Sequence, residues 1–296
     1  MDTSMKRRFY LLTVFLTLLL CGCSRKMPQY NIVATTLPVY SFTSDICQGT
    51  NLTVGRLVTE NVSCLHDYTL DVGQMRMVEQ ADAIVISGAG LEDFMDDALH
   101  GARGIIDASK NTHIHEGGHN HNNEAHEGHS HEHDPHIWLS PENAKIMAES
   151  ICNGLIGRYP EYKGVFLDNL ETLTEKLDAL QVYGDTQLST LSCRELITFH
   201  DGFAYFAESF DLTILEAVEE ESGSEASAAE LIHLIQQVNE HSLPAVFTEK
   251  SGSDAAAGII ATETGAEIFT LDMVMSGDSY FDAMYYNIDT IKEALG

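Results

Sequence analysis

Short apolar runs alternate with helical patterns along most of the chain. Residues 32–34, 54–58 and 83–86 form apolar runs of strand length, and Pro38 opens a segment whose apolar residues recur at helical spacing. Similar runs return in the second half at 196–199, 245–247 and 268–271. Strands that alternate with helices are typical of parallel sheets covered on both faces. The pattern therefore predicts an α/β fold built from two similar halves.

A longer helical pattern separates the two halves. Aromatic and aliphatic residues recur at steps of three and four from Tyr162 to Leu180, and no glycine or proline interrupts residues 165–183. A helix of about 22 residues would be about 33 Å long. Because Pro160 marks its start, we expect a stiff connecting helix over residues 160–184.

The N-terminus has the features of a bacterial export signal. A basic patch at residues 6–8 precedes an apolar run, 9–20, which is shorter than the roughly 18 residues that a spanning helix needs. The run ends in Leu20-Cys21-Gly22-Cys23, which resembles a bacterial lipobox with cleavage after Gly22. Cys23 would then carry lipid and anchor the protein to the cell membrane, outside the cytoplasm. An ordinary signal peptide with incidental cysteines is the alternative.

These features divide the chain into five parts. We expect a signal peptide over 1–22, a lipid-anchored tether over 23–30, an N-terminal α/β lobe over 31–159, a linker helix over 160–184 and a C-terminal α/β lobe over 185–296. Each lobe would hold a parallel sheet flanked by helices, and the rigid helix would join the two lobes.

The charge of the chain narrows the class of partner. It has 45 acidic and 16 basic residues, which give a formal net charge of −29 at pH 7. A protein that binds nucleic acid needs a surplus of basic residues to neutralise phosphates, so we exclude a nucleic-acid partner. An acidic chain suits the handling of cations, although net charge alone locates no site.

A histidine-rich segment interrupts the first half at residues 113–133. Eight of its 21 residues are histidine, four are glutamate, and most of the rest are glycine, asparagine and serine. Such a segment cannot bury enough apolar surface to fold alone, and dense histidine tracts bind transition metals weakly. We therefore expect auxiliary weak metal sites, rather than one ordered site, at His113, His115, His119, His121, His126, His129, His131 and His133.

Three histidines and one aspartate stand apart from that segment. His66, His136 and His200 each follow or border a predicted strand end, and Asp272 follows another. The carboxyl ends of parallel strands face the ligand crevice of an open α/β sheet, so these side chains could converge on a cleft between two lobes. Three imidazole nitrogens and one carboxylate oxygen suit tetrahedral Zn²⁺. Nearby aspartates could orient the imidazoles by hydrogen bonds; the candidates are Asp67, Asp134 and Asp201.

Four cysteines follow the lipobox, at positions 47, 64, 152 and 193. An oxidising compartment permits disulfides, and four cysteines allow three pairings, among which the irregular spacing selects none. Cys64 lies two residues before His66, so a thiolate ligand is conceivable, although a buried thiol or a half-cystine is favoured.

Several motifs together resemble one family along almost all of the mature sequence. They are Ala34-Thr35-Thr36-Leu37-Pro38, His66-Asp67-Tyr68, Asp134-Pro135-His136-Ile137-Trp138-Leu139-Ser140-Pro141, Phe199-His200-Asp201-Gly202-Phe203-Ala204-Tyr205-Phe206, Phe247-Thr248-Glu249, Ala261-Thr262-Glu263-Thr264-Gly265-Ala266, Leu271-Asp272 and Ser279-Tyr280-Phe281. The chain resembles the zinc- and manganese-binding solute-binding lipoproteins of ABC uptake transporters.

That resemblance implies a fold and a ligand set. It implies two α/β lobes joined by a rigid helix, with the metal in the cleft between them. The implied ligands are His66, His136 and His200, with Asp272 or a water as the fourth and Glu249 as the alternative. Manganese-preferring relatives tend to place a carboxylate where this chain has His200, so the resemblance favours Zn²⁺ over Mn²⁺.

The leading hypothesis is a monomeric receptor that captures Zn²⁺ outside the cytoplasm and delivers it to an ABC permease for import. A manganese receptor of the same family and a zinc-buffering surface adhesin remain alternatives. A zinc hydrolase is a remote one, because the sequence has no His-Glu-x-x-His helix and no clear general base. We therefore expect a binding protein rather than an enzyme.

Overall fold

The computed structural model describes residues 29–60, 62, 65, 68–115, 133–218, 226–250 and 254–296. Several predicted features lie outside the described residues. They are the signal peptide, the lipid-modified Cys23, and Cys64, His66, Asp67, His119, His121, His126, His129 and His131. Within the described ranges, no helix combines the length and the apolar character that crossing a membrane requires.

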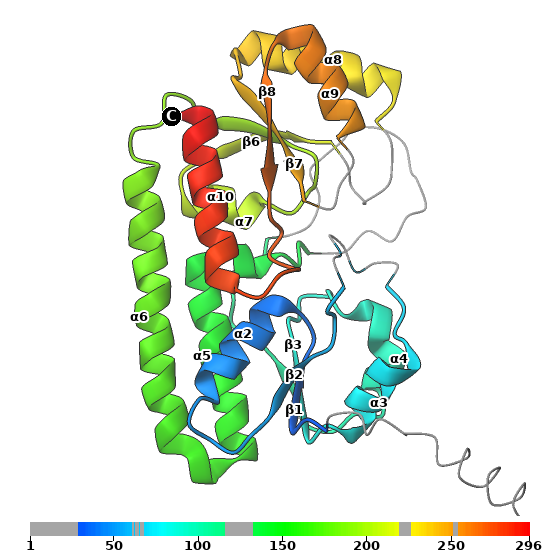
Figure 1. Ribbon diagram of the computed structural model, residues 1–296, viewed down its shortest axis with the longest axis vertical. Coiled ribbons are helices and arrows are strands. Elements are labelled where there is room, and N and C mark those ends of the chain that lie inside the picture. Colours follow the sequence, from blue (N-terminus) through cyan, green and yellow to red (C-terminus); the bar gives the residue numbers. More distant parts are fainter. Residues whose placement is uncertain are drawn as a thin grey trace, which may run out of the picture.

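The N-terminal lobe holds a four-stranded sheet with all neighbouring strands parallel, in the order β2-β1-β3-β4. Its strands are β1 (Ile32–Ala34), β2 (Val54–Arg56), β3 (Ala83–Ile86) and β4 (Ile105–Asp107). Its helices are α2 (Leu37–Ile46), α3 (Val72–Gln80), α4 (Asp96–Leu99) and α5 (Pro141–Arg158). Figure 1 shows α2 and α5 on one face of this sheet and α3 and α4 on the other.

The C-terminal lobe repeats the plan with a parallel sheet in the order β6-β5-β7-β8. Its strands are β5 (Glu195–Thr198), β6 (Thr213–Ala217), β7 (Ala245–Glu249) and β8 (Glu267–Leu271). Its helices are α7 (Ala204–Ser209), α8 (Ala228–His241), α9 (Ala255–Thr264) and α10 (Tyr280–Leu295). The predicted fold class, two lobes with parallel sheets flanked by helices, is confirmed.

Helix α6 (Lys163–Gln187) joins the lobes. It runs along both of them, beside α5 and α2 in one and α10 in the other (Figure 1). A short 3-10 turn at Pro160–Tyr162 precedes it. The helix therefore begins three residues after the expected position 160 and continues three residues past 184, because the proline opens the turn rather than the helix itself.

Side-chain alternation along the central strands sorts the core into layers. In β1, Ile32 and Ala34 face a cluster that also contains residues of α5, α6 and α10, whereas Val33 faces a separate cluster under α3. In the other sheet, Phe247 of β7 joins the first cluster, while Val246 packs under α8 and α9. One face of each sheet thus contributes to a core that the two lobes share.

Two strands were not predicted from the sequence, and both lie at sheet edges. Ile105 of β4 is 41% exposed, and β6 carries no fully buried residue. Each has only two consecutive aliphatic residues, at 105–106 and 214–215, so it leaves a weak pattern. Among the described cysteines, Cys47, Cys152 and Cys193 are free thiols, and burial raises the pKa of Cys47 to about 12 and that of Cys152 to about 11.

The close approach of α6 to the C-terminal lobe gives a test of this packing. A methyl group at Gly184 would overlap the ring of Phe210, which is itself buried. We expect Gly184→Ala to lower the unfolding free energy by about 1–3 kcal/mol, measured by urea unfolding. Gly164→Ala on the same helix meets nothing within 4 Å and is expected to be neutral or stabilising by about 1 kcal/mol at most. Equal effects of the two substitutions would contradict this packing.

Candidate metal centre

Two of the predicted ligands reach the centre of the molecule from different parts of the chain. His136 lies in the loop that leads into a 3-10 turn at Ile137–Leu139 and then into α5. It therefore does not follow a strand, and the sequence-based expectation of a strand end is wrong for this residue. His200 lies two residues after β5, where the hydroxyl of Thr198 donates to the His200 carbonyl at 3.0 Å.

The two imidazole rings meet at their Nε2 atoms. These atoms are 3.4 Å apart, and the rings are nearly perpendicular, with centroids 5.2 Å apart. His136 is 6% exposed and His200 is 3% exposed. The pair is therefore buried, and its two Nε2 nitrogens face each other.

Asp134 fixes the orientation of the His136 ring. Its Oδ1 atom accepts from the backbone N–H of His136 at 2.9 Å and lies 2.8 Å from the ring Nδ1. A carboxylate accepts hydrogen bonds, so Nδ1 carries the hydrogen and the neutral ring keeps its lone pair on Nε2. This contact, one of those suggested by the sequence, directs the Nε2 nitrogen toward His200.

The spacing of the two nitrogens is the spacing that a zinc ion requires. Two nitrogens bound to one tetrahedral zinc at about 2.0–2.1 Å lie roughly 3.3–3.4 Å from each other. The observed separation of 3.4 Å falls at that value. No side chain would have to move along the line between the two nitrogens for both to bind one ion.

Gly202 makes this approach possible, and sequence reasoning did not single it out. A Cβ atom at this position would lie 2.6 Å from the Met273 Cε, 2.8 Å from the His200 Cδ2 and 3.0 Å from the His136 Cε1. Any larger residue would therefore push the two rings or Met273 aside. The signal was present in the His200-Asp201-Gly202 motif, but only the structure shows what the glycine touches.

Trp138 connects the pair to the C-terminal lobe. Its ring lies edge-on to His136 with centroids 5.4 Å apart, and its Nε1 donates to the Met273 carbonyl at 2.9 Å. The hydroxyl of Tyr280 donates to the Trp138 carbonyl at 2.8 Å. This tryptophan is fully buried, and it is the only one in the chain.

The two candidate carboxylates differ in their surroundings. The Glu249 Oε2 lies 3.8 Å from the His200 Nδ1, and both side chains are 3% exposed. Asp272 directly follows β8, but its carboxylate pairs with Lys250, whose Nζ lies 2.8 Å from the Asp272 Oδ2. Sequence reasoning missed Lys250 altogether.

A small pocket lies beside these carboxylates. Its volume is about 10 Å³, the space of a single water, and it is lined by Glu249, Lys250, Asp272, Met273, Met275, Ser276 and, from the N-terminal lobe, Val62. Within the described ranges, no three His, Cys, Asp or Glu side chains cluster closely enough to hold a metal ion. The third predicted histidine, His66, lies outside those ranges.

The ends of the histidine-rich segment pack against the fold. The Asn143 side chain bonds both the backbone N–H and the carbonyl of His113. His115 stacks on Tyr205 of α7, with centroids 4.2 Å apart, and its Nε2 lies 2.7 Å from Glu208. The exposed His133 precedes Asp134, whose backbone N–H donates to the His115 carbonyl at 3.3 Å. The two described ends of the segment, at His115 and His133, therefore lie close together near His136.

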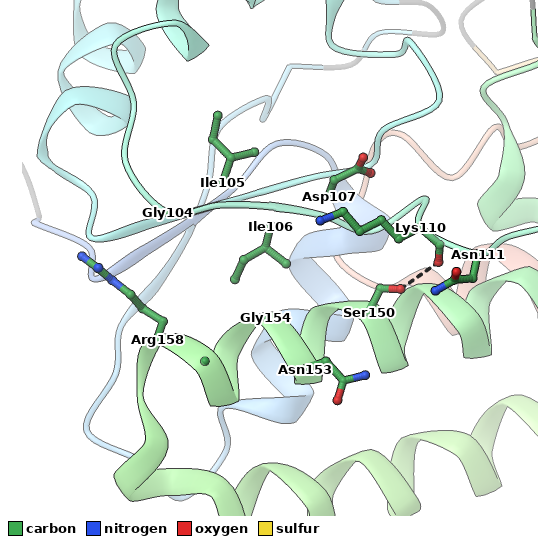
Figure 2. A pocket seen from close by; sticks show the side chains of 11 residues that line it. Gly104, Ile105, Ile106, Asp107, Lys110, Asn111, Ser150, Asn153, Gly154 and Arg158 are labelled. Atoms are coloured by element: carbon green, nitrogen blue, oxygen red, sulfur yellow. Dashed lines mark hydrogen bonds between the residues drawn. The ribbon is translucent and has the colours of Figure 1, made fainter.

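A much larger cavity contains none of the predicted ligands. Figure 2 shows this pocket of about 480 Å³ between β4 and α5, with Lys110 and Arg158 toward its two ends. The bond drawn there joins the Ser150 hydroxyl to the Lys110 carbonyl at 2.9 Å. Its size and lining suit neither a bare ion nor the histidine chemistry of the interlobe pair.

A third buried carboxylate, that of Glu92, lies at the carboxyl ends of the central strands of the N-terminal sheet. Glu92 accepts from the Thr35 hydroxyl at 2.6 Å and from the backbone N–H groups of Ser87 and Gly88 at 2.7 and 2.9 Å. Thr35 follows β1 and Ser87 follows β3, so Glu92 ties together the carboxyl ends of two strands. Burial raises the pKa of Glu92 to about 7, although its hydrogen bonds act in the opposite direction.

Known proteins of one kind match the chain over most of its length. A family model described as "Zinc-uptake complex component A periplasmic" matches residues 32–294. A crystal structure of ZnuA has a TM-score of 0.79 at 28% identity, over 91% of this chain and 100% of the other. The Zn(II)-bound ZnuA-like domain of Streptococcus pneumoniae AdcA has a TM-score of 0.75 at 26% identity, over 90% and 99%.

A full-length streptococcal relative extends beyond the matched region. The zinc-binding lipoprotein AdcA of Streptococcus pneumoniae serotype 4 is 28% identical over an alignment of 314 positions. The alignment covers 98% of this chain and 61% of AdcA. The chain thus spans about three fifths of the length of that relative. The match supports a shared lobe architecture, and the remainder of AdcA has no counterpart in the alignment.

Glu92 gives a prediction for the pH dependence of stability. Because its folded pKa of about 7 lies above the ordinary value of 4.5, Glu92 stabilises the fold below pH 4.5 and loses that contribution as the pH rises through 7. Between pH 5 and 7.5, the unfolding free energy of the wild type should fall by about 2 kcal/mol relative to Glu92→Gln, measured by urea unfolding. Glu79→Gln, at an exposed position of α3, should follow the wild type. Parallel curves for wild type and Glu92→Gln would contradict the pKa shift.

Proposed function

Because the chain belongs to the family of the periplasmic zinc-uptake complex component A, we propose that it is an extracytoplasmic receptor that captures Zn²⁺ and delivers it to the permease of an ABC transporter. The observation that carries the proposal is the buried His136–His200 pair, whose Nε2 atoms are 3.4 Å apart. Zinc is the cargo in this scheme, so the protein binds and releases it without chemical change.

The proposed ligands are His136, His200 and His66, with Asp272 or a water in the fourth position. Glu249 is the alternative fourth ligand, since its carboxylate is the acidic group beside His200. Imidazole nitrogens suit zinc, whereas Mn²⁺ prefers carboxylate, carbonyl and water oxygens. The imidazole nitrogens of His136 and His200 therefore support zinc over manganese as the cargo.

The surroundings of the pair support binding rather than catalysis. Among the described residues, the pocket beside Glu249 and Asp272 has room for about one water, which is too small for an organic substrate. A closed site with four protein or water ligands holds an ion, whereas a hydrolase needs an open coordination position that a substrate can reach. We therefore propose that the chain is not an enzyme.

The remaining features complete the proposal. The signal peptide over 1–22 and a lipid on Cys23 would hold the protein, as a monomer, at the outer face of the bacterial cell membrane. The histidine-rich segment would bind further zinc weakly. Because both lobes share one hydrophobic core along α6, release to the permease would need local movement of the ligand loops rather than a wide hinge motion.

A competitive titration with Zn²⁺ and Mn²⁺ tests the proposal. The wild type should bind one zinc tightly and manganese more weakly. A version in which a short glycine linker replaces residues 116–132 should keep that tight equivalent, because His136 and His200 lie outside the replaced residues and the ends of the segment keep their contacts through His113 and His115. His200→Ala should weaken it by about a hundredfold or more, since it removes one of the two buried nitrogens.

His233→Ala is the matched control for the loss of an imidazole. His233 pairs with Glu216 at 3.0 Å on the exposed face of α8, so its removal should leave zinc affinity unchanged. Weak, multiple binding that disappears with residues 116–132 would contradict the receptor and favour a metal-buffering surface protein. Tighter binding of manganese than of zinc would keep the receptor and overturn the choice of metal.

A further inference from the structure

We propose that Lys250 is a specificity-determining residue of the metal centre: its ammonium group masks the Asp272 carboxylate and thereby biases the site against Mn²⁺. The inference rests on the proposed function, and it adds a residue that no ligand set includes. It starts from the ion pair between Lys250 and Asp272, which both line the small pocket beside Glu249.

Asp272 is held by several hydrogen bonds, and among the described residues Lys250 is the charged group that contacts its carboxylate. Its backbone exchanges two hydrogen bonds of 2.7 Å with the Asn287 side chain, and its Oδ1 accepts from the backbone N–H of Val274 at 2.7 Å. The second oxygen, Oδ2, lies 2.8 Å from the Lys250 Nζ. The carboxylate is 7% exposed, so it cannot turn to water to avoid the ammonium group.

Lys250 is placed on this carboxylate by the fold. Its backbone N–H donates to the Leu271 carbonyl at 3.0 Å, which sets the residue beside Asp272 at the end of the β7–β8 pair. Its ammonium group also lies 4.2 Å from the centroid of the Tyr286 ring. The Tyr286 hydroxyl is tied in turn to the Thr270 carbonyl at 2.9 Å. The Lys250 ammonium group therefore lies between the Asp272 carboxylate and the Tyr286 ring, and both contacts hold it in place.

A divalent ion on Asp272 would have to share the carboxylate with this ammonium group. Two cations on one carboxylate lie about 4–5 Å apart and repel each other. A metal ion that binds the Asp272 carboxylate must therefore either displace the Lys250 ammonium group or bind against its repulsion. The site that an arriving ion meets is consequently dominated by the histidine nitrogens.

This masking affects the two metals unequally. Zinc gains most of its affinity from imidazole, whereas Mn²⁺ depends on oxygen ligands. A site that loses one carboxylate oxygen therefore loses more affinity for manganese than for zinc. Lys250 would thus add discrimination to a set of protein ligands that already favours zinc.

Four variants test the inference by competitive Zn²⁺ and Mn²⁺ titration of the purified protein: Lys250→Met, Lys250→Arg, Asp272→Asn and the double variant Lys250→Met/Asp272→Asn. Methionine keeps an unbranched side chain and removes the charge. Lys250→Met should raise manganese affinity about tenfold and zinc affinity by much less, because the repulsion is lost. Lys250→Arg should keep the wild-type selectivity, and the effect of Lys250→Met should vanish in the Asp272→Asn background.

Lys176→Met is the matched control. Lys176 also pairs with an aspartate, Asp45, at 2.8 Å and also approaches an aromatic ring, Phe281, at 5.9 Å. It is 49% exposed, close to the 43% of Lys250, but it lies on α6 away from the histidines. Its substitution should leave both metal affinities unchanged, which separates masking of Asp272 from a general loss of positive charge. Thermal unfolding of each variant verifies that it is folded.

The outcomes separate this inference from the proposed function. If Lys250→Met changes the zinc-to-manganese selectivity by less than about twofold, or if its effect persists in the Asp272→Asn background, the inference is wrong and the receptor stands. If the wild type has no tight zinc site that depends on His200, the proposed function fails, and the role of Lys250 fails with it.

Discussion

Both sheets turn one face toward the same hydrophobic core, which also contains residues of α5, α6 and α10, and the position of the histidine pair depends on it. His136 enters from the loop before α5 and His200 from the loop after β5, so their separation is set by how the lobes pack. Contacts across the lobes reinforce that packing, among them the edge-on pair of Phe42 and Tyr280 at 4.8 Å. A wide hinge motion would expose this core to water at a cost of about 25 cal/mol per Å² of apolar surface, which is why we place the mobility in loops.

The chemistry of the centre follows from the hydrogen bonds and ion pairs that each of its polar groups makes. Asp134 accepts from the His136 ring and so directs the lone pair of Nε2 inward, whereas the Glu249 Oε2 lies 3.8 Å from the His200 Nδ1. Two imidazoles flanked by carboxylates form an environment that attracts a cation without placing an anion directly between them. Asp272 is different, because Lys250 already compensates its charge. In this proposal, the Nε2 atoms of His136 and His200 are available to a metal ion, whereas the Asp272 Oδ2 is already paired with Lys250.

Much of this architecture could be predicted from the sequence, because buried strands leave apolar runs such as Ile32–Ala34 and Ala245–Glu249. The strands β4 and β6 could not, since each contributes only two consecutive aliphatic residues, at 105–106 and 214–215. Motifs brought His136 and His200 to attention, and the structure places them together. Gly202 and Lys250 escaped sequence reasoning for a common reason: their importance lies in contacts with residues distant in the chain. Lys250 stands 22 positions from Asp272, and only the parallel pairing of β7 with β8 makes them neighbours.

The central claim is that one zinc ion sits between the facing nitrogens of His136 and His200. Zinc K-edge X-ray absorption on the protein loaded with one equivalent, with residues 116–132 replaced by a glycine linker, tests it most directly. The account predicts a first shell of nitrogen and oxygen near 2.0–2.1 Å, outer-shell scattering from at least two imidazoles, and no sulfur. A sulfur shell near 2.3 Å would place Cys64 on the metal, and a shell of about six oxygens without imidazole would remove the histidines from it. Either result would contradict the account.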